Sequence, residues 1–66
     1  MQVFINDKAF ECGESATLRE TLENNGINTE HVAVAVDYTV IPRAEWDKTY
    51  LKDGSKIIII KAVQGG

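Results

Sequence analysis

One short segment of this sequence carries a full helix signature, and it limits what the chain can fold into. Its Thr-Leu-Arg-Glu start matches a capping box, in which the Thr17 hydroxyl accepts the N–H of Glu20 and the Glu20 side chain reaches back. Leu18 and Leu22 lie four apart on one helical face, and an Asn-Gly pair follows as a left-handed stop. We therefore predict one helix from Thr17 to Asn25. A helix of fewer than about 12 residues is marginal alone in water, so it must pack on a sheet.

Most of the remaining chain has the pattern of strands separated by turns. Alternation and β-branched residues predict strands at Gln2–Asn6, Ala9–Cys12, Val32–Val36, Val40–Ile41 and Lys56–Val63. Turn chemistry at Asn6-Asp7-Lys8, Asp37-Tyr38 and Asp53-Gly54 separates several of them, and Ala44–Lys48 is expected to form one helical turn around Trp46.

The order of these elements predicts the fold. A hairpin, a helix and then further strands give an α+β protein of the β-grasp type, with a mixed four- to five-stranded sheet and one helix packed on one face. We predict a β-grasp domain over residues 1–63 and a flexible Gly-Gly tail over residues 64–66.

Size and charge narrow the classes of function. A chain of 66 residues has little room for an enclosed pocket with a full catalytic set, so an adaptor, carrier or inhibitor is favoured over an enzyme. The net charge is −3, and seven basic residues are scattered among ten acidic ones, which argues against nucleic acid or an anionic membrane as partner.

Cysteine usage and the lack of export signals predict a cytoplasmic protein. Cys12 is the single cysteine, so no disulfide can form within the chain, whereas small secreted domains usually contain several. The sequence contains no signal peptide, and its apolar runs are far shorter than the ~20 residues of a membrane span.

Searches for catalytic and metal-binding patterns find none. His31 is the only histidine and has no cysteine at ligand spacing, so we expect no metal site. Ser15 lacks a histidine that could act as its base, and the internal glycines are isolated and form no phosphate-binding loop. We therefore expect a protein that is not an enzyme and that holds no permanent cofactor.

The last predicted strand contains four consecutive isoleucines, Ile57–Ile60. A sheet with one solvated face should alternate apolar and polar residues, and this strand does not. If Ile57 and Ile59 face the helix, an apolar patch lies on the other face and marks a partner surface. Its predicted members are Phe4, Ile58, Ile60 and Ala62. A loop covering this face, or a homodimer, would also explain the pattern.

The chain ends in Gly65-Gly66, directly after this strand. Glycine lets the main chain pass where no Cβ would fit, so the pair can present a bare carboxylate to an active site. The residues alone leave two interpretations open: a reactive C-terminus or a frayed end.

The chain as a whole resembles a known family. Its opening Met-Gln-Val-Phe-Ile, its element order and its Gly-Gly end resemble ubiquitin-like β-grasp proteins. Its later segments resemble the ThiS family, the bacterial and archaeal sulfur carriers of thiamine thiazole synthesis. These segments are Val40-Ile41-Pro42-Arg43 with Trp46, Leu51-Lys52-Asp53-Gly54-Ser55 and Lys61-Ala62-Val63-Gln64-Gly65-Gly66.

The nearest rival is the MoaD family of molybdopterin synthesis, which has the same fold and tail. Its members are typically longer and often have a proline pair where this chain has Lys61-Ala62. The chain departs from the ThiS pattern at two turn positions. Asp37-Tyr38 stands where Asn-Gly-like pairs are common, and Ser55 stands where an acidic residue often follows Asp-Gly.

The resemblance implies a sulfur-carrier mechanism. An E1-like enzyme of the ThiF type would use ATP to adenylate Gly66, and a persulfide donor would convert the acyl-adenylate to a thiocarboxylate. A thiazole synthase of the ThiG type would then accept the sulfur. Gly65 and Gly66 would thread the enzyme's channel, Val63 and Gln64 would extend the tail, and the apolar patch would dock.

The resemblance also implies a free carrier that is a monomer and that is recycled as a co-substrate. Two functions from other classes remain open at this point. One is a covalent protein modifier joined to lysine through Gly66, and the other is a plain binding module with an inert tail.

Overall fold

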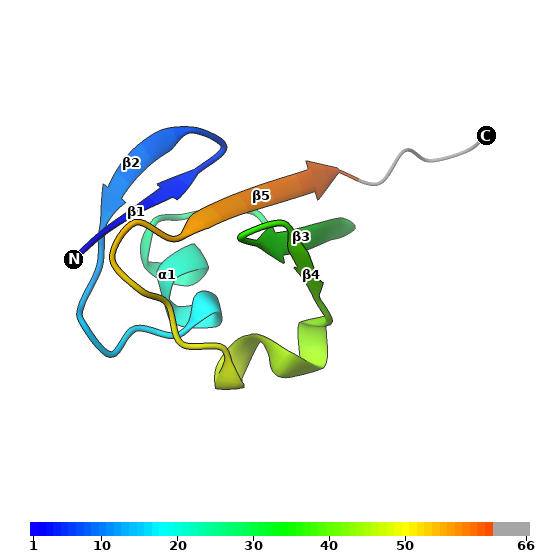
Figure 1. The fold of residues 1–66 in the computed structure, drawn as a ribbon. Coiled ribbons are helices and arrows are strands. Elements are labelled where there is room, and N and C mark those ends of the chain that lie inside the picture. Colours follow the sequence, from blue (N-terminus) through cyan, green and yellow to red (C-terminus); the bar gives the residue numbers. More distant parts are fainter. Residues whose placement is uncertain (62–66) are drawn as a thin grey trace.

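The computed structural model describes residues 1–61, which form one mixed sheet with one α-helix and one 3-10 helix on the same side (Figure 1). The helices are α1 (Leu18–Asn24) and η1 (Arg43–Lys48). The strands are β1 (Gln2–Ile5), β2 (Lys8–Glu11), β3 (Val32–Val36), β4 (Thr39–Ile41) and β5 (Lys56–Lys61).

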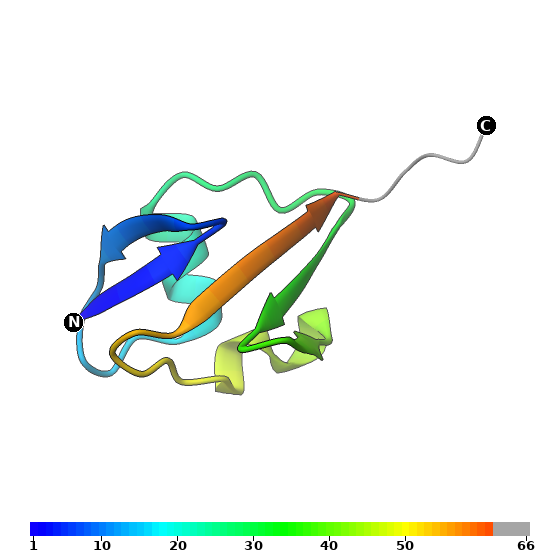
Figure 2. The same ribbon diagram turned by 45° about the horizontal axis from the view of Figure 1, so that its top comes forward.

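The last strand in sequence is the central strand of the sheet, whose order is β2-β1-β5-β3-β4. β5 pairs with β1 in parallel and with β3 antiparallel, and the β1–β2 and β3–β4 hairpins lie on its two sides (Figure 2). One helix between two hairpins of a five-stranded mixed sheet is the β-grasp arrangement, so the predicted fold class is confirmed.

The capping box at the start of α1 is present as the sequence predicts. The Thr17 Oγ1 accepts from the Glu20 N–H at 3.2 Å, and the Glu20 Oε1 accepts from the Thr17 N–H at 3.0 Å. The helix ends at Asn24, and Gly26 follows with a φ of 68°. This local pattern places the fully buried Leu18 and Leu22 against the sheet.

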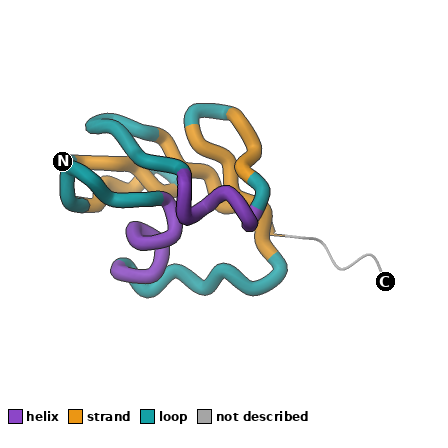
Figure 3. The backbone as a smooth tube through the Cα atoms, turned by 90° about the horizontal axis from the view of Figure 1, so that it is seen from below, coloured by secondary structure: helices purple, strands orange, loops and turns teal. Residues whose placement is uncertain are grey.

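A single core lies between the helix side of the sheet, α1 and η1, and Figure 3 shows the two helical segments on this side. Trp46 is its largest buried side chain, and the indole Nε1 donates to the Ile41 carbonyl at 2.9 Å. The Arg43 guanidinium lies over the indole ring, 4.5 Å from its centroid. The predicted helical turn is thus a 3-10 helix that closes the core. The buried residues of this core are Val3, Ile5, Leu18, Leu22, Val34, Trp46, Leu51 and Ile57.

Both hairpins turn through two residues with positive φ, as type I′ turns require. The φ values are 48° and 70° at Asn6 and Asp7, and 49° and 70° at Asp37 and Tyr38. Because the first turn has two residues and not three, β2 begins at Lys8, one residue earlier than predicted.

The first residue of each turn also fixes its hairpin to the central strand. The Asn6 Oδ1 accepts from the Ile59 N–H at 2.9 Å, and the Asp37 Oδ1 accepts from the Lys56 N–H at 3.0 Å. Both hairpin tips are therefore bonded to β5 through side chains as well as through the sheet.

Candidate functional site

The predicted reacting residue lies outside the part of the chain that the structure describes. The same holds for the rest of the predicted tail and for one member of the predicted patch: these residues are Ala62, Val63, Gln64, Gly65 and Gly66. The predicted division between a domain of residues 1–63 and a tail of residues 64–66 stays a prediction for the same reason. The structure does show the segment that precedes them, which is β5, paired with β3 as far as Lys61.

β5 separates its four isoleucines between two faces. Ile57 is 1% exposed within the core and Ile59 packs against that core, whereas Ile60 is 46% exposed. Ile58 lies on the same face as Ile60 and is half-buried. Phe4 shares this face because its strand neighbours Val3 and Ile5 are both in the core. The described members of the predicted patch thus have the predicted orientation, while their role in docking stays a prediction.

The patch continues over β3 and β4, which the sequence reasoning missed. β3 directs Val32, Val34 and Val36 to the core side, so Ala33 and Ala35 lie on the open face. The register pairs Ala33 with Ile60, and Ala35 with both Ile58 and Val40. We define the open-face patch as Phe4, Ala33, Ala35, Val40, Ile58 and Ile60.

The Val-Ala alternation of β3 was the available signal for this extension. Once the valines are assigned to the core, the alanines must lie on the other face. Ala33 is exposed, whereas Ala35 is only 4% exposed, so Ala35 adds little accessible surface to the middle of the patch. The patch is wholly apolar: it can bury area against a partner, and it offers no group that could attack or protonate a substrate.

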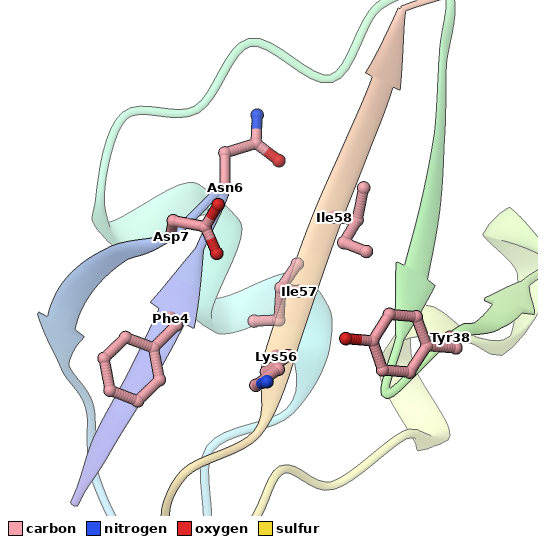
Figure 4. Close-up of a pocket in the computed structure, with 7 residues that line it drawn as sticks. All are labelled: Phe4, Asn6, Asp7, Tyr38, Lys56, Ile57 and Ile58. Carbon is pink, nitrogen blue, oxygen red and sulfur yellow. The ribbon is translucent and has the colours of Figure 1, made fainter.

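A hollow of about 350 Å³ lies at one end of the patch, between Phe4 and Tyr38 (Figure 4). Ile58 and Ile57 form part of its lining, and Asp7 and Lys56 contribute one charge of each sign. Tyr38 is 76% exposed and holds a φ of 70°, which a bulky side chain rarely adopts. The structure therefore adds an aromatic side chain on a strained turn to the surface predicted from sequence.

The described residues offer little for metal or catalytic chemistry. Among residues 1–61 there is no group of three or more His, Cys, Asp and Glu side chains able to hold a metal ion. Cys12 is half-buried and His31 is exposed, and neither belongs to the open-face patch. None of the helices described is long and apolar enough to cross a membrane.

Comparison with known proteins identifies the family of this chain. The sequence model of the ThiS family matches residues 3–66, which is nearly the whole chain and includes the Gly-Gly end. The chain belongs to the ThiS family.

Individual relatives align with this chain over its whole length. The chain is 30% identical to the sulfur carrier protein ThiS of Escherichia coli, and the match covers 100% of both chains. It is 32% identical to an uncharacterized protein of Porphyra purpurea, covering 100% of this chain and 93% of the other. The crystal structure of the thiamine biosynthesis protein ThiS from Geobacter metallireducens superposes with a TM-score of 0.86 at 28% identity and covers 100% of both chains.

Proposed function

We propose that the carboxylate of Gly66 is the reacting group of this protein. The chain is a sulfur carrier protein of thiamine biosynthesis, since the ThiS family matches it through residue 66 and a bacterial sulfur carrier aligns over its whole length. That end-to-end match is the observation that supports the proposal. The matched range includes positions 65 and 66, which supports a role for the Gly-Gly pair in the carrier chemistry.

The chemistry of a carboxylate explains why the carrier needs an activating partner. A free carboxylate resists nucleophilic attack because oxide is a poor leaving group. An E1-like enzyme of the ThiF type would join the Gly66 carboxylate to the AMP portion of ATP and release pyrophosphate. A persulfide or sulfide sulfur would then attack the acyl carbon and displace AMP, which leaves a C-terminal thiocarboxylate. A thiazole synthase of the ThiG type would take this sulfur and return the carboxylate.

In this proposal the residues of the chain divide into two groups. Gly65 and Gly66 thread the partner's channel because they carry no Cβ, and Val63 and Gln64 extend their reach. The open-face patch, together with Ala62, docks the domain so that the tail enters in one direction. The carrier is a recycled co-substrate and not the catalyst, and ATP is consumed by its partner in the cytoplasm.

The open-face patch supports this arrangement because two of its members lie on β5, the strand that precedes the tail in the sequence. Ile58 and Ile60 belong to β5 and precede Ala62 in the sequence by four and two residues, respectively. Each buried Å² of apolar surface contributes roughly 25 cal/mol to association before the costs of ordering, so a shallow apolar sheet face is suited to reversible docking. A carrier that serves an activating enzyme and then an acceptor needs such reversibility.

The test is the intact mass of the protein after incubation with ATP, a ThiF-type enzyme from the same organism and a sulfur donor. We expect a gain equal to the replacement of one oxygen by sulfur, located on Gly66 by fragmentation. A control chain with one alanine added after Gly66 should fold equally well and gain no mass. An unchanged mass of the wild-type chain, with an enzyme shown to be active on another carrier, would contradict the proposal. Addition of the whole chain to lysine side chains would indicate a protein modifier instead.

A further inference from the structure

A second hollow lies on the core side of the sheet, where β5 approaches the tail. Its volume is about 380 Å³, and three segments far apart in sequence enclose it. These are the tip of the β1–β2 hairpin, the loop that follows α1 and the end of β5, which Figure 2 shows side by side. The apolar part of its lining is Ile5, Phe10, Ile27 and Ile59.

The charged side chains that line this hollow are both cationic. They are Lys8 at the start of β2 and Lys61 at the end of β5, and both are exposed. The chain has ten acidic residues and a net charge of −3, yet none of the described residues lining the hollow is a carboxylate. An adjoining hollow of about 300 Å³ shares Lys61 and is also lined by Glu30 and His31. The Glu30 carboxylate therefore lies near Lys61 but does not line the hollow of about 380 Å³.

The two asparagines of the lining add further hydrogen-bond donors. The Asn6 Oδ1 accepts from the Ile59 N–H at 2.9 Å, and the Asn28 Oδ1 accepts from the Glu30 N–H at 3.0 Å. Because backbone donors fix both amide oxygens, each Nδ2 is left to donate. The polar side chains around the apolar floor thus bring two lysine ammonium groups and two amide NH2 donors and no carboxylate, which complements an anion.

We propose that this hollow, which we call the donor hollow, binds an acidic segment of an enzyme that takes the tail. A Glu or Asp carboxylate of that enzyme lies between Lys8 and Lys61, and an adjacent apolar side chain covers the floor. The inference rests on the proposed function. Lys61 immediately precedes residues 62–66, so any enzyme that holds Gly66 in its active site has to pass close to this rim.

Charge complementarity of this kind predicts a measurable and salt-dependent effect on affinity. Exposed charge pairs contribute modestly, but reversing both lysines replaces two attractions by two repulsions. We expect Lys8→Glu/Lys61→Glu to weaken binding about tenfold at low salt, with a smaller difference at high salt because screening shortens the range of the interaction.

The matched control is Lys48→Glu/Lys52→Glu, which makes the same change in net charge at two exposed lysines outside the donor hollow. Both variants and the wild-type chain are titrated into the ThiF-type enzyme and, separately, into the ThiG-type enzyme at two salt concentrations. Lys8→Arg/Lys61→Arg should retain wild-type affinity, and thermal unfolding of all variants should match. A selective loss with either enzyme supports the inference.

Equal dissociation constants for the two charge-reversed variants with both enzymes would overturn it. This outcome is distinguishable from failure of the proposed function, because conversion of wild-type Gly66 to the thiocarboxylate is read by mass on the same samples. If wild-type Gly66 is converted but Lys8→Glu/Lys61→Glu loses no more affinity than the control variant, only the donor-hollow proposal is contradicted. If Lys8→Glu/Lys61→Glu alone loses affinity while wild-type Gly66 is not converted, the donor-hollow proposal is supported and the proposed sulfur chemistry is contradicted.

Discussion

The two faces of β5 have the same residue type and opposite physical roles. Ile57 is 1% exposed against the helices, and Ile60, three residues later, is 46% exposed on the open-face patch. The core side contains both helical segments and every large buried side chain of the core, whereas the described part of the other side has no covering element. The difference indicates that this small domain obtains its stability from one face, and under the proposed function the other face is the one that binds a partner.

The largest expected effect is the difference in free energy of unfolding between the Ile57→Ala and Ile60→Ala variants. Removing a buried isoleucine side chain costs about 2–5 kcal/mol in free energy of unfolding, whereas the exposed one should cost under about 1 kcal/mol. Domains of this size have only about 3–10 kcal/mol in total, so Ile57→Ala should lose a large share of its free energy of unfolding. Urea unfolding followed by circular dichroism measures both. Equal losses would show that the open face is covered.

The second prediction concerns binding without loss of stability. Ile60→Glu should weaken binding to the ThiF-type enzyme about tenfold, or ~1.4 kcal/mol, because a charge would have to be desolvated in the docked patch. Ser15→Glu adds the same charge in an exposed loop and should bind like the wild-type chain. Light scattering of Ile60→Glu adds a separate test. A fall in mass relative to the wild-type chain would mean that the patch joins two copies of the protein.

A smaller effect is expected at the start of α1, on the core side. Thr17→Ala removes the acceptor for the Glu20 N–H and should lower the free energy of unfolding by about 1 kcal/mol. Thr17→Ser keeps the hydroxyl and should lose much less. Chemical denaturation of the three proteins decides this, and an unaffected Thr17→Ala variant would show that packing alone holds the helix.

The smallest effect, with opposite sign, is expected at Tyr38. Its φ of 70° favours glycine, so Tyr38→Gly should raise the free energy of unfolding by about 0.5–1 kcal/mol. The same denaturation experiment gives the sign. A loss of stability would mean that contacts of the Tyr38 ring outweigh the backbone strain, and the ring would then belong to the fold more than to the surface.

Sequence reasoning succeeded where the signal was local. The capping box, the β3 segment Val32–Val36 and the turn at Asp37-Tyr38 each depend on residues within a few positions of one another. The two-residue period of a strand also assigned the faces of β5 correctly, although its four isoleucines do not alternate with polar residues. The strand order was harder to predict, because the bond from the Ile59 N–H to Asn6 spans 53 residues and has no local sequence pattern.

In the candidate site, too, some features have a local sequence signal and others depend on residues far apart in the sequence. Gly65-Gly66 and the isoleucine run could be recognised directly, and Ala33, Ala35 and Val40 follow once β3 is assigned its faces. The donor hollow could not be predicted, since Lys8, Ile27 and Lys61 meet only in the folded chain. The orientation of its two asparagine amides depends on the backbone N–H from which each amide oxygen accepts a hydrogen bond.

The central position of β5 also determines how the domain responds when its tail is pulled. The strand is bonded to β1 on one side and to β3 on the other, and the bonds of a sheet run across the strand direction. Tension along the strand axis therefore loads many of these bonds in shear at once, whereas an edge strand can be peeled away bond by bond. In the function proposed above, an enzyme that pulled on the end of this chain would therefore load the central strand without unravelling the domain that delivers it.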